Sequence, residues 1–480
     1  MLEGLEAAEI LWSEFVLNND YIRLDSEFQN RERKDVIETL KNIGAVQFGE
    51  GKPVIIHPHE ISRSYVEDSG VWFFRAQNNR PMMIEASNKV FISQDDANSL
   101  TKNHLRKNDV VVTRTGANAG DCALFDNMEQ AVASSHTFII RSKEWRHSYL
   151  TAFFNSRFGR VQIITSRYGA AQPEVAPYYL RNIWIPKFTD KFYQEIDEQF
   201  KEAHQATNSA HDCLNKAEIT LLKTLELDSW MPPTPLSYVR SSNDAFTAGR
   251  FDAEYFHPAK TSALSILDNL SDARVGDFFE SIRDLWQPSK SKEAAVRNHD
   301  LTDALEPFLD PTKVPTLIEE IRSTKKLVQP GDLVVSRLRS YLREIAVVLP
   351  GDGTTTVVST EYIVLRPKKS SPLAIEALLI YLRSQLPQIV FKWSQDGSNH
   401  PRFDENELLN IPIPRALISN QENYVKAMQE MISQRQLAAS LLEAAKRSVE
   451  IAIEDSEAAA LAYLQGGSYE RRQSNRSSLI

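Results

Sequence analysis

The chain has 480 residues, of which 42% are hydrophobic and 25% are charged, and its formal net charge is −9 at pH 7. This length allows two or more domains with separate cores, and the acidic balance excludes a protein that coats nucleic acid over its whole surface. There is no run of eighteen apolar residues and no basic segment followed by an apolar run at the N-terminus, which predicts a cytoplasmic protein with no membrane partner.

Three sequence patterns occur twice along the chain, in the same order. They are RLDSEF at 23–28 and RFDAEY at 250–255, DVVVTR at 109–114 and DLVVSR at 332–337, and GAAQPEVAPYYLRNIWIP at 169–186 and GSNHPRFDENELLNIPIP at 397–414. The shifts are 227, 223 and 228 positions, much longer than the periods of about 20–50 residues in solenoids. We therefore interpret the chain as two copies of one module, which predicts a ligand with two similar parts.

Each module has the pattern of an α/β (α+β) fold. Strand-like segments such as Val71–Phe74 and Val110–Val112 are rich in β-branched and aromatic residues. A helical stretch follows, at Tyr149–Arg160 in the first module and Ile375–Ser384 in the second. Each module then closes on a short strand that ends in proline, which suits the edge or the exit of a sheet.

A long helix with a heptad pattern follows each module, because apolar residues alternate at spacings of four and three. The seam residues are Ile196, Phe200, Ala203, Thr207, Ala210, Leu214, Ala217 and Leu221 in the first helix, and Tyr424, Met428, Met431, Arg435, Ala438, Leu442, Ala445 and Val449 in the second. We expect the two helices to pack as an antiparallel coiled-coil pair related by a pseudo-two-fold axis. The alternative is that each helix packs on its own module.

The predicted boundaries follow from these elements. They are a first module at 1–188, a helix at 189–229, a second module at 230–414, a second helix at 415–465 and a polar, disordered tail at 466–480. Between Asp190 and Asp228 there are nine acidic residues and four basic ones, so the first long helix should not lie on nucleic acid.

Several catalytic patterns are absent from the sequence. Gly44–Gly49 has the glycine spacing of a phosphate-binding loop, but Glu50 replaces the required lysine. There is also no Asn/Asp-Pro-Pro-Tyr/Phe element of adenine methyl transfer, no His-Glu-x-x-His and no CxxC pair. We expect Cys122 and Cys213 to be buried free thiols in a reducing compartment.

Paired carboxylates stand at 25/27 and at 252/254, in the repeated opening pattern of each module. An arginine lies two residues before each aspartate, so we favour a structural ion pair over a catalytic or metal-binding role. His257 has no counterpart in the first module and is expected to be a surface or packing residue.

Three regions of each module carry side chains suited to DNA bases, since Arg, Asn and Gln make bidentate contacts with guanine and adenine edges. In the first module they are Arg75, Gln77, Asn78 and Arg80, then Arg114, Thr115 and Asn118, and then Arg167 and Gln172. In the second module they are Arg297, Asn298 and His299, then Arg337, Arg339, Tyr341 and Arg343, and then Lys392, Asn399, His400 and Arg402. Framework positions match between the modules while these residues differ, as expected of a reader of two different half-sites.

Together these features resemble the specificity (S) subunit of type I restriction–modification systems. The resemblance rests on the Arg-x-Asp-x-Glu-aromatic opening, the Asp-hydrophobic-Val-Val-Ser/Thr-Arg strand, and the Gly-x-x-Gln/His-Pro turn that leads to Ile-x-Ile-Pro. It covers nearly the whole chain, in the order target-recognition domain, helix, target-recognition domain, helix.

The resemblance implies a non-catalytic subunit that reads a bipartite site in double-stranded DNA, with no metal and no cofactor of its own. The helices would act as a spacer and dock two methyltransferase (M) subunits, which bind S-adenosylmethionine, and restriction (R) subunits would join them. Arg114 and Arg337 would be the loop arginines near DNA, although the second loop has Arg-Leu-Arg-Ser where Arg-Thr-Gly-Ala is typical. The alternatives are a similar reader in another phage-defence assembly, a self-contained modification or restriction enzyme, and a scaffold without a DNA role.

Overall fold

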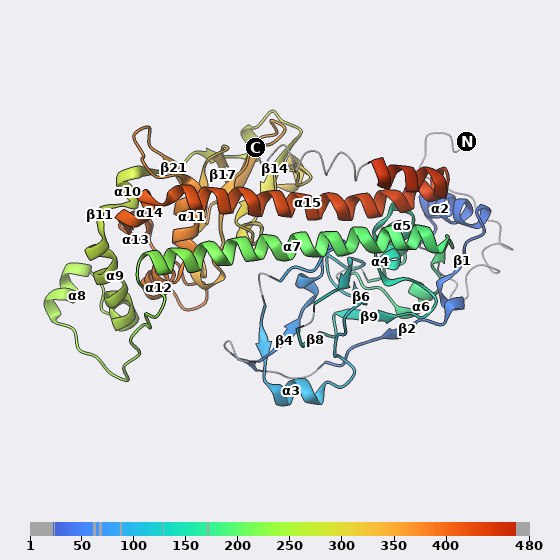
Figure 1. The fold of residues 1–480 in the computed structure, drawn as a ribbon, viewed down its shortest axis with the longest axis horizontal. Coiled ribbons are helices and arrows are strands. Elements are labelled where there is room, and N and C mark those ends of the chain that lie inside the picture. The colour runs from blue at the N-terminus through green and yellow to red at the C-terminus, as the bar shows by residue number, and fades with distance from the viewer. Residues whose placement is uncertain are drawn as a thin grey trace. The chain divides into compact units, whose positions relative to one another are not determined.

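A computed structural model of the chain describes residues 23, 25–60, 64–66, 70–86, 89–127, 129–169 and 172–466. The chain forms two compact units: unit 1 comprises Met1–Thr207 with Arg435–Ile480, and unit 2 comprises Asn208–Gln434. Two long helices, α7 (Asp190–Thr224) and α15 (Gln421–Glu454), each contribute residues to both units (Figure 1). The tail expected to be disordered lies, from residue 467 onward, outside the described residues.

Unit 1 contains sheets with the strand orders β2-β9-β6-β7 and β3-β5-β4-β8 and the short pair β1-β10. Its strands are β1 (Val46–Gln47), β2 (Val54–Ile56), β3 (Tyr65–Val66), β4 (Val71–Phe74), β5 (Phe91–Ile92), β6 (Asp109–Thr113), β7 (Cys122–Phe125), β8 (Ala131–Ala133), β9 (Thr137–Arg141) and β10 (Trp184–Ile185). Its other helices are α2 (Arg31–Asn42), α3 (Gln94–Ser99), α4 (His147–Asn155), α5 (Arg157–Thr165) and α6 (Pro177–Arg181).

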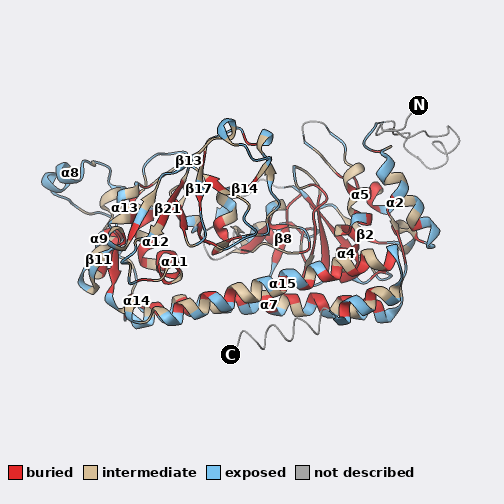
Figure 2. Cartoon of the chain, turned by 90° about the horizontal axis from the view of Figure 1, so that it is seen from above, coloured by how far each residue is buried: buried red, intermediate tan, exposed pale blue. Residues whose placement is uncertain are grey.

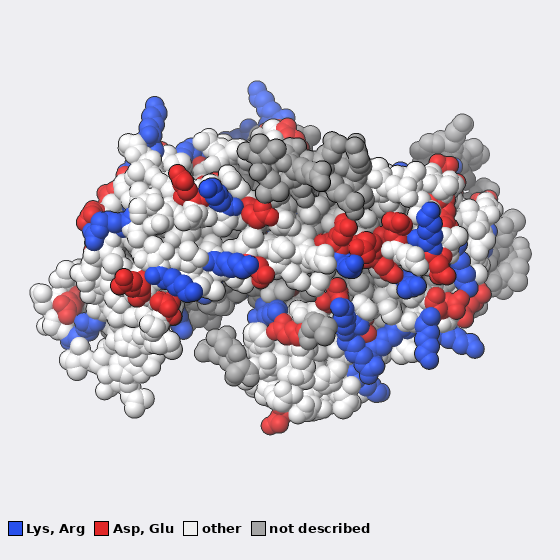
Figure 3. Space-filling model, viewed as in Figure 1, with Lys and Arg blue, Asp and Glu red and all other residues white. Residues whose placement is uncertain are grey.

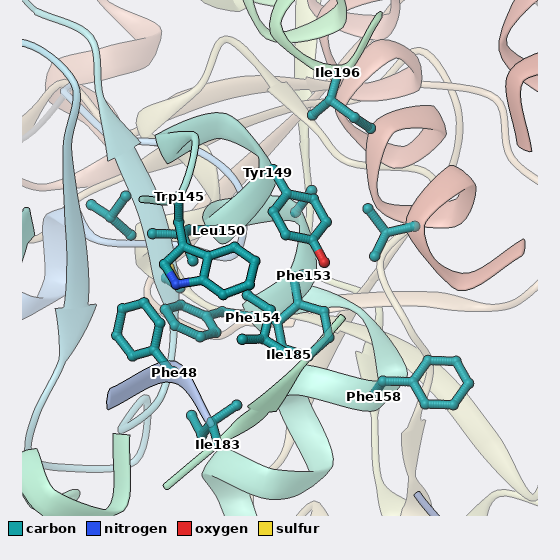
Figure 4. Close-up of a cluster of buried hydrophobic side chains, with 14 of the residues drawn as sticks. Phe48, Trp145, Tyr149, Leu150, Phe153, Phe154, Phe158, Ile183, Ile185 and Ile196 are labelled. Atoms are coloured by element: carbon teal, nitrogen blue, oxygen red, sulfur yellow. The ribbon is translucent and has the colours of Figure 1, made fainter. Parts of the chain in front are cut away.

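The core of unit 1 surrounds α4, whose residues from Ser148 to Phe154 are all buried. Figure 4 shows the aromatic side chains of this cluster, among them Tyr149, Phe153 and Phe154. Strand β6 is buried on both faces, because Val110 and Val112 pack into this cluster while Val111 packs on the opposite side with Trp72. Burial on both faces explains why its sequence is a continuous apolar run instead of an alternating one.

Unit 2 contains sheets with the strand orders β12-β21-β18-β19-β15 and β13-β17-β20-β14-β16 and the short pair β11-β22. Its strands are β11 (Ser271–Arg274), β12 (Phe279–Ile282), β13 (Leu285–Trp286), β14 (Ala295–His299), β15 (Phe308–Leu309), β16 (Thr316–Leu317), β17 (Lys325–Val328), β18 (Leu333–Ser336), β19 (Ile345–Val348), β20 (Thr356–Ser359), β21 (Tyr362–Pro367) and β22 (Pro412–Pro414). Its other helices are α8 (Ser242–Ala248), α9 (Pro258–Leu270), α10 (Val275–Phe278), α11 (Ile375–Arg383), α12 (Gln385–Ser394), α13 (Glu405–Leu409) and α14 (Arg415–Ser419).

The same strand arrangement recurs in the two units, since β12-β21-β18-β19 repeats the order of β2-β9-β6-β7. A buried ion pair recurs with it: Arg141 pairs with Asp109 of β6, and Arg366 pairs with Asp332 just before β18. Helices α4 and α11 are both nine residues long and lie 228 positions apart. The gap-free match between the modules therefore begins before Gly169, where the sequence pattern first showed it. The mixed α/β class expected from the sequence is confirmed.

The opening pattern of the first module forms a clamp on the end of α5. Arg23 forms an ion pair with Asp25 and donates a hydrogen bond of 2.6 Å to the carbonyl oxygen of Ser166. The second carboxylate oxygen of Asp25 accepts from the backbone N–H of Phe28 at 3.0 Å. Burial by itself raises the pKa of Asp25, but the hydrogen bonds from Arg23 and from this N–H together outweigh burial and lower it.

The second module repeats the clamp. Arg250 donates to Asp252 at 2.6 Å and to the carbonyl oxygen of Gln395, at the end of α12, at 3.2 Å. Asp252 accepts from the backbone N–H of Tyr255 at 2.9 Å. The predicted structural ion pair is therefore present in both units, and its task is to fix the start of each module to its helical layer.

Buried residues of α7 and α15 pack together in three groups, and α7 and α15 lie side by side (Figure 1), with buried and exposed residues alternating along both (Figure 2). The groups are Phe192, Ile196 and Phe200 with Ala445, Val449 and Ala452, then Ala203 and Ala206 with Ala438 and Leu441, and then Ala210, Ala217 and Leu221 with Tyr424, Met428 and Met431. The buried stripe departs from the expected heptad, because Leu441 is buried where Leu442 was expected and Leu214 is only half-buried. Leu441 packs with Ala203 and Ala206 of α7, so contacts with the partner helix, and not the heptad alone, determine which side of α15 is buried here.

The two cysteines are free thiols, as predicted. Cys122 is buried, but Cys213 is only half-buried on α7. Burial raises the pKa of both thiols, so neither is a ready thiolate at neutral pH. In the part of the chain that the structure describes, no helix is both long and apolar enough to cross a membrane.

Candidate nucleic-acid interface

In unit 1 the loop after β6 is joined by its backbone to the turn after α5. The N–H of Val175 donates to the carbonyl oxygen of Arg114 at 2.9 Å, and the N–H of Gly116 donates to that of Pro173 at 3.0 Å. These bonds hold the loop that begins at Arg114 against the turn that contains Gln172. Two of the three candidate regions of the first module therefore form one surface, which we call the junction.

Unit 2 contains the same junction. The N–H of Phe403 donates to the carbonyl oxygen of Arg337 at 3.1 Å, and the N–H of Arg339 donates to that of Pro401 at 3.1 Å. Arg339 occupies the place of Gly116, and both have positive φ, 51° and 96°. A left-handed backbone conformation costs about 1–2 kcal/mol for a residue with a side chain, but not for glycine. The second loop thus keeps the backbone path of the first although it has a less suitable residue there, and that residue adds a half-buried cation.

The arginine at the head of each junction is held by a carboxylate. Arg114 Nε donates to Glu174 at 2.6 Å, and Arg337 Nε donates to Glu361 at 3.1 Å. The two glutamates come from different elements, the turn in unit 1 and the segment before β21 in unit 2. The side chains of Arg114 and Arg337 are 23% and 43% exposed. Each guanidinium is therefore fixed along one edge and still reaches the surface.

The second junction holds its carboxylate more strongly. Arg402 donates two hydrogen bonds to Glu361, at 2.9 and 2.7 Å, in addition to the bond from Arg337. Hydrogen bonding to Arg402 and then to Arg337 lowers the pKa of Glu361 against the opposing effect of burial. In the first junction Arg114 instead contacts His57 Nε2 at 2.5 Å, and burial together with this arginine lowers the pKa of His57.

The loop that follows β4 contains both structural and exposed candidates. Asn78 is buried, accepts from the N–H of Arg75 at 3.0 Å and donates to the carbonyl oxygen of Glu85 at 3.0 Å, so its amide braces the loop. Gln77 is exposed, and Arg75 and Arg80 are half-buried.

Sequence reasoning missed Asn79, which is buried and ties this loop to the first junction. Its amide nitrogen donates to the carbonyl oxygen of Val111 at 3.1 Å, to Thr113 Oγ1 at 3.1 Å and to the carbonyl oxygen of Asp121 at 2.8 Å. The sequence offered one sign of this role, which is that Asn79 is a second asparagine directly after Asn78. The third candidate region is therefore fixed to the other two.

The structure differs from the expected match between Arg75 and Arg297. Residues 297–299 lie in β14, which pairs with β20 as residues 72–74 of β4 pair with β8. Arg297 is buried, pairs with Asp352 at 3.0 Å and donates to the carbonyl oxygen of Lys313 at 3.0 Å. His299 is also buried, and Asn298 is half-buried. The loop that corresponds to the one after β4 begins at Asp300, three residues later than the sequence echo suggested.

We expect His299 to make unit 2 less stable in acid. Burial lowers its pKa to about 4, whereas an imidazole in the unfolded chain has a pKa of about 6.5. Between these values the unfolded state binds more protons, so stability is fully present above pH 6.5 and is lost as the pH falls towards 4. Phe74 stands at the equivalent position, so His299→Phe should keep the fold and flatten the dependence of unfolding free energy on pH, measured by urea unfolding from pH 7.5 to 4. Equal pH profiles for the two proteins would contradict this assignment.

The remaining candidates of unit 1 lie around the junction. Thr115 Oγ1 contacts His136 Nδ1 at 2.6 Å, Asn118 is half-buried and Gln172 is exposed. Arg160 was not predicted, and its guanidinium lies 2.8 Å from Asp121. Burial raises the pKa of Asp121, although Arg160, Arg80 and Arg167 act against the shift. Arg160 lies in α5 and Arg167 just beyond its end, whereas Arg80 follows β4, so only the fold brings Arg80 close enough to act on the same carboxylate.

The remaining candidates of unit 2 divide into two groups. Tyr341 on the loop, Asn399 and His400 on the turn, and Lys392 in the last turn of α12 are exposed, and Arg339 Nη2 lies 3.4 Å from His400 Nδ1. Arg343 instead approaches Glu218 of α7 at 3.7 Å, which directs it towards the helix. His257 stacks on Trp393 with ring centroids 3.7 Å apart, in keeping with the predicted packing role.

Within the described segments, no three His, Cys, Asp or Glu side chains gather as a metal site would require. No family model matches the chain, and no curated protein matches it. Among solved structures, the chain is similar to the HsdS subunit from Thermoanaerobacter tengcongensis, at 13% identity over 86% of this chain and 96% of that one, with a TM-score of 0.26.

Two further solved structures are similar over most of the chain. The type I restriction–modification S subunit from M. genitalium is 12% identical over 88% of this chain and 96% of that one, with a TM-score of 0.32. A chain from a type I R-M system, studied for complex assembly and conformational transition, is 15% identical over 88% and 96%, with a TM-score of 0.24.

Proposed function

We propose that the protein is a DNA sequence-specificity subunit and that each unit reads one half of a bipartite site. The observation that supports this most is the recurrence of the junction. The same backbone hydrogen bonds fix a loop arginine in both units, while the exposed residues around it differ. A repeated scaffold with different surface side chains suits two different half-sites.

The chemistry of the junction arginines fits base recognition. A guanidinium presents paired N–H donors that match O6 and N7 of guanine in the major groove. Glu174 and Glu361 each hold one edge of an arginine, which reduces the conformational freedom that binding would otherwise have to remove. Gln77, Gln172 and Asn399 are exposed amides in the same regions and could add contacts to adenine.

The long helices are assigned a different task, as an antiparallel coiled-coil pair that docks partner proteins. Early residues of α7 pack with late residues of α15 and the reverse, which supports this pairing. Figure 3 shows acidic side chains gathered on one stretch of α7 and α15, with basic side chains interspersed along the rest, and the acidic stretch repels phosphate. We propose that two methyltransferase subunits bind there, carrying S-adenosylmethionine, that restriction subunits join them, and that this chain itself is non-catalytic.

Substitution of the junction arginines tests the proposal. Arg114→Ala should weaken binding through the first half-site only, and Arg337→Ala through the second only, because one bidentate base contact contributes about 1–3 kcal/mol. DNA selected from a random library by the full chain with its co-expressed partners supplies the site, and Kd is measured on DNA with either half-site changed. Arg415→Ala, which removes an exposed arginine of unit 2 outside the junction, is the matched control.

Two results would count against base reading. If both variants lost affinity equally for every DNA sequence, with a shallower salt dependence, the arginines would contact phosphates instead. If the full chain with its partners selected no DNA at all, the assignment of this protein as a DNA reader would be wrong.

A further inference from the structure

A polar cavity of about 350 Å³ lies next to the second junction. Three cationic side chains, from three different segments, line it: Arg283 follows β12, Lys326 lies in β17 and Arg337 follows β18. Thr360 contributes to the same wall. The cavity is therefore continuous with the surface assigned to DNA, but two of its cations belong to none of the regions that the sequence suggested.

Lys326 is the least satisfied of the three cations. Its ammonium group is half-buried and donates to the carbonyl oxygen of Tyr362 at 2.6 Å. Among the described residues, no carboxylate lies within ion-pair distance of its Nζ atom. Burial lowers its pKa, and Arg337 and Arg283 add to the shift against the pull of Glu405. An anion in the cavity would offset both the desolvation and the repulsion.

The acidic residues of the cavity are already engaged. Glu405 accepts from Arg283 Nη2 at 3.0 Å, and Asp404 caps α13 by accepting from the N–H of Asn406 at 2.8 Å. Arg283 nevertheless keeps 73% of its side chain exposed. Glu405 therefore positions the Arg283 side chain without using all of its N–H donors, and the remaining donors are available to a ligand.

We propose that this cavity binds a phosphate group. A phosphate offers several acceptor oxygens to the Arg283 guanidinium, the Lys326 ammonium group and the Thr360 hydroxyl, and Arg and Lys are the usual phosphate ligands. The DNA backbone is the source that the proposed function favours, so this inference rests on that function; a free phosphate is the other source with the same chemistry. Lys326 and Arg283 are then phosphate contacts that set the register of the second unit on the duplex.

Unit 1 has the same positions but not the same charge. His57 follows β2, and Arg283 follows β12. These strands are equivalent, because β2 pairs with β9 as β12 pairs with β21. Asn103 takes the place of Lys326. The residue after Asn103, His104, pairs with Val132 of β8, and the residue after Lys326, Leu327, pairs with Val357 at the equivalent position of β20. Burial and Arg114 lower the pKa of His57, which disfavours its charged form. The phosphate cavity is therefore a property of unit 2, which should carry more of the salt dependence of binding.

The test compares the full wild-type chain, with its co-expressed partners, against Lys326→Gln. The Kd for the selected DNA and for unrelated DNA is measured between 50 and about 300 mM NaCl, a range over which counterion release dominates. Lys326→Gln should reduce the slope of log K against log salt by about 0.9 on both DNAs. The control is Lys369→Gln, an equal loss of charge beyond the far end of β21, which should leave the slope unchanged.

Neutral phosphates locate the contact. A methylphosphonate at one position of the selected DNA should weaken the wild type and leave Lys326→Gln unaffected. If Lys326→Gln kept the wild-type slope while the wild type still selected its DNA, the cavity proposal would be overturned and the proposed function would stand.

Inorganic phosphate provides the second arm. If the wild type selected no DNA, the proposed function would fall, and ³¹P NMR titration with inorganic phosphate would decide the cavity on its own. Binding that Lys326→Gln abolishes would support a site for free phosphate, and absence of binding would overturn it.

Discussion

Replacing Arg366 by alanine is expected to lower the free energy of unfolding by about 3–5 kcal/mol, the effect of leaving a buried charge without its partner. The side chain of Asp332 is 0% exposed and accepts two hydrogen bonds from Arg366, both of 2.7 Å. Without that guanidinium, the carboxylate keeps the backbone N–H of Gln329, at 2.9 Å, as a donor. Urea unfolding at pH 7 measures the loss.

The duplication supplies a matched test of the same pair. Arg141→Ala removes the corresponding partner of Asp109, whose side chain is 4% exposed, and a loss of similar size is expected. Arg415→Ala is the control, because its ion pair with Asp272 is exposed and such pairs contribute about 0–1 kcal/mol. Equal losses for all three variants would show that burial does not set the strength of these pairs.

Leu221→Ala is expected to destabilise the protein by about 2–5 kcal/mol, the range for large-to-small substitutions in a core. Leu221 is 0% exposed and belongs to the cluster that holds Tyr424 and Met428 of α15. The loss would show in the midpoint of urea unfolding. Ile219→Ala is the control on the same helix, since Ile219 is 51% exposed and surface substitutions shift stability by about 0.5 kcal/mol or less. Comparable losses at both positions would contradict the packing of α7 against α15 at this point.

Much of the fold could be predicted because the chain contains two copies of its pattern. The clamp of Arg23 and Arg250 was predicted as an ion pair from residue spacing alone, and the structure confirms it. The long helices followed from the heptad spacing, which depends only on local periodicity. Local periodicity does not determine which residues a partner helix covers, and Leu441, not Leu442, is the buried one because it packs with Ala203 and Ala206 of α7.

The candidate site was predicted less completely, for reasons of register. Arg297 resembles a loop residue in the sequence, but a position in a paired strand makes it a buried partner of Asp352. A shift of a few residues in strand register changes which side chains reach the surface, and one sequence does not reveal it. Lys326 was missed for a related reason. The sequence around it does not indicate that Arg283 and Arg337, from other segments, line the same cavity.

The order in which the segments of the chain enter the two units has a consequence for biosynthesis. Unit 2 is a continuous stretch, Asn208–Gln434, whereas unit 1 takes its first and last segments from opposite ends of the chain. Ala445, Val449 and Leu464 belong to the same apolar core as Ile196 and Phe200. On the ribosome, unit 2 has all of its residues while the core of unit 1 still lacks its final helix. The nascent chain must therefore carry an open apolar surface until the residues from Ala445 to Leu464 have been synthesised, and a truncation that removes them would impair the unit that was synthesised first.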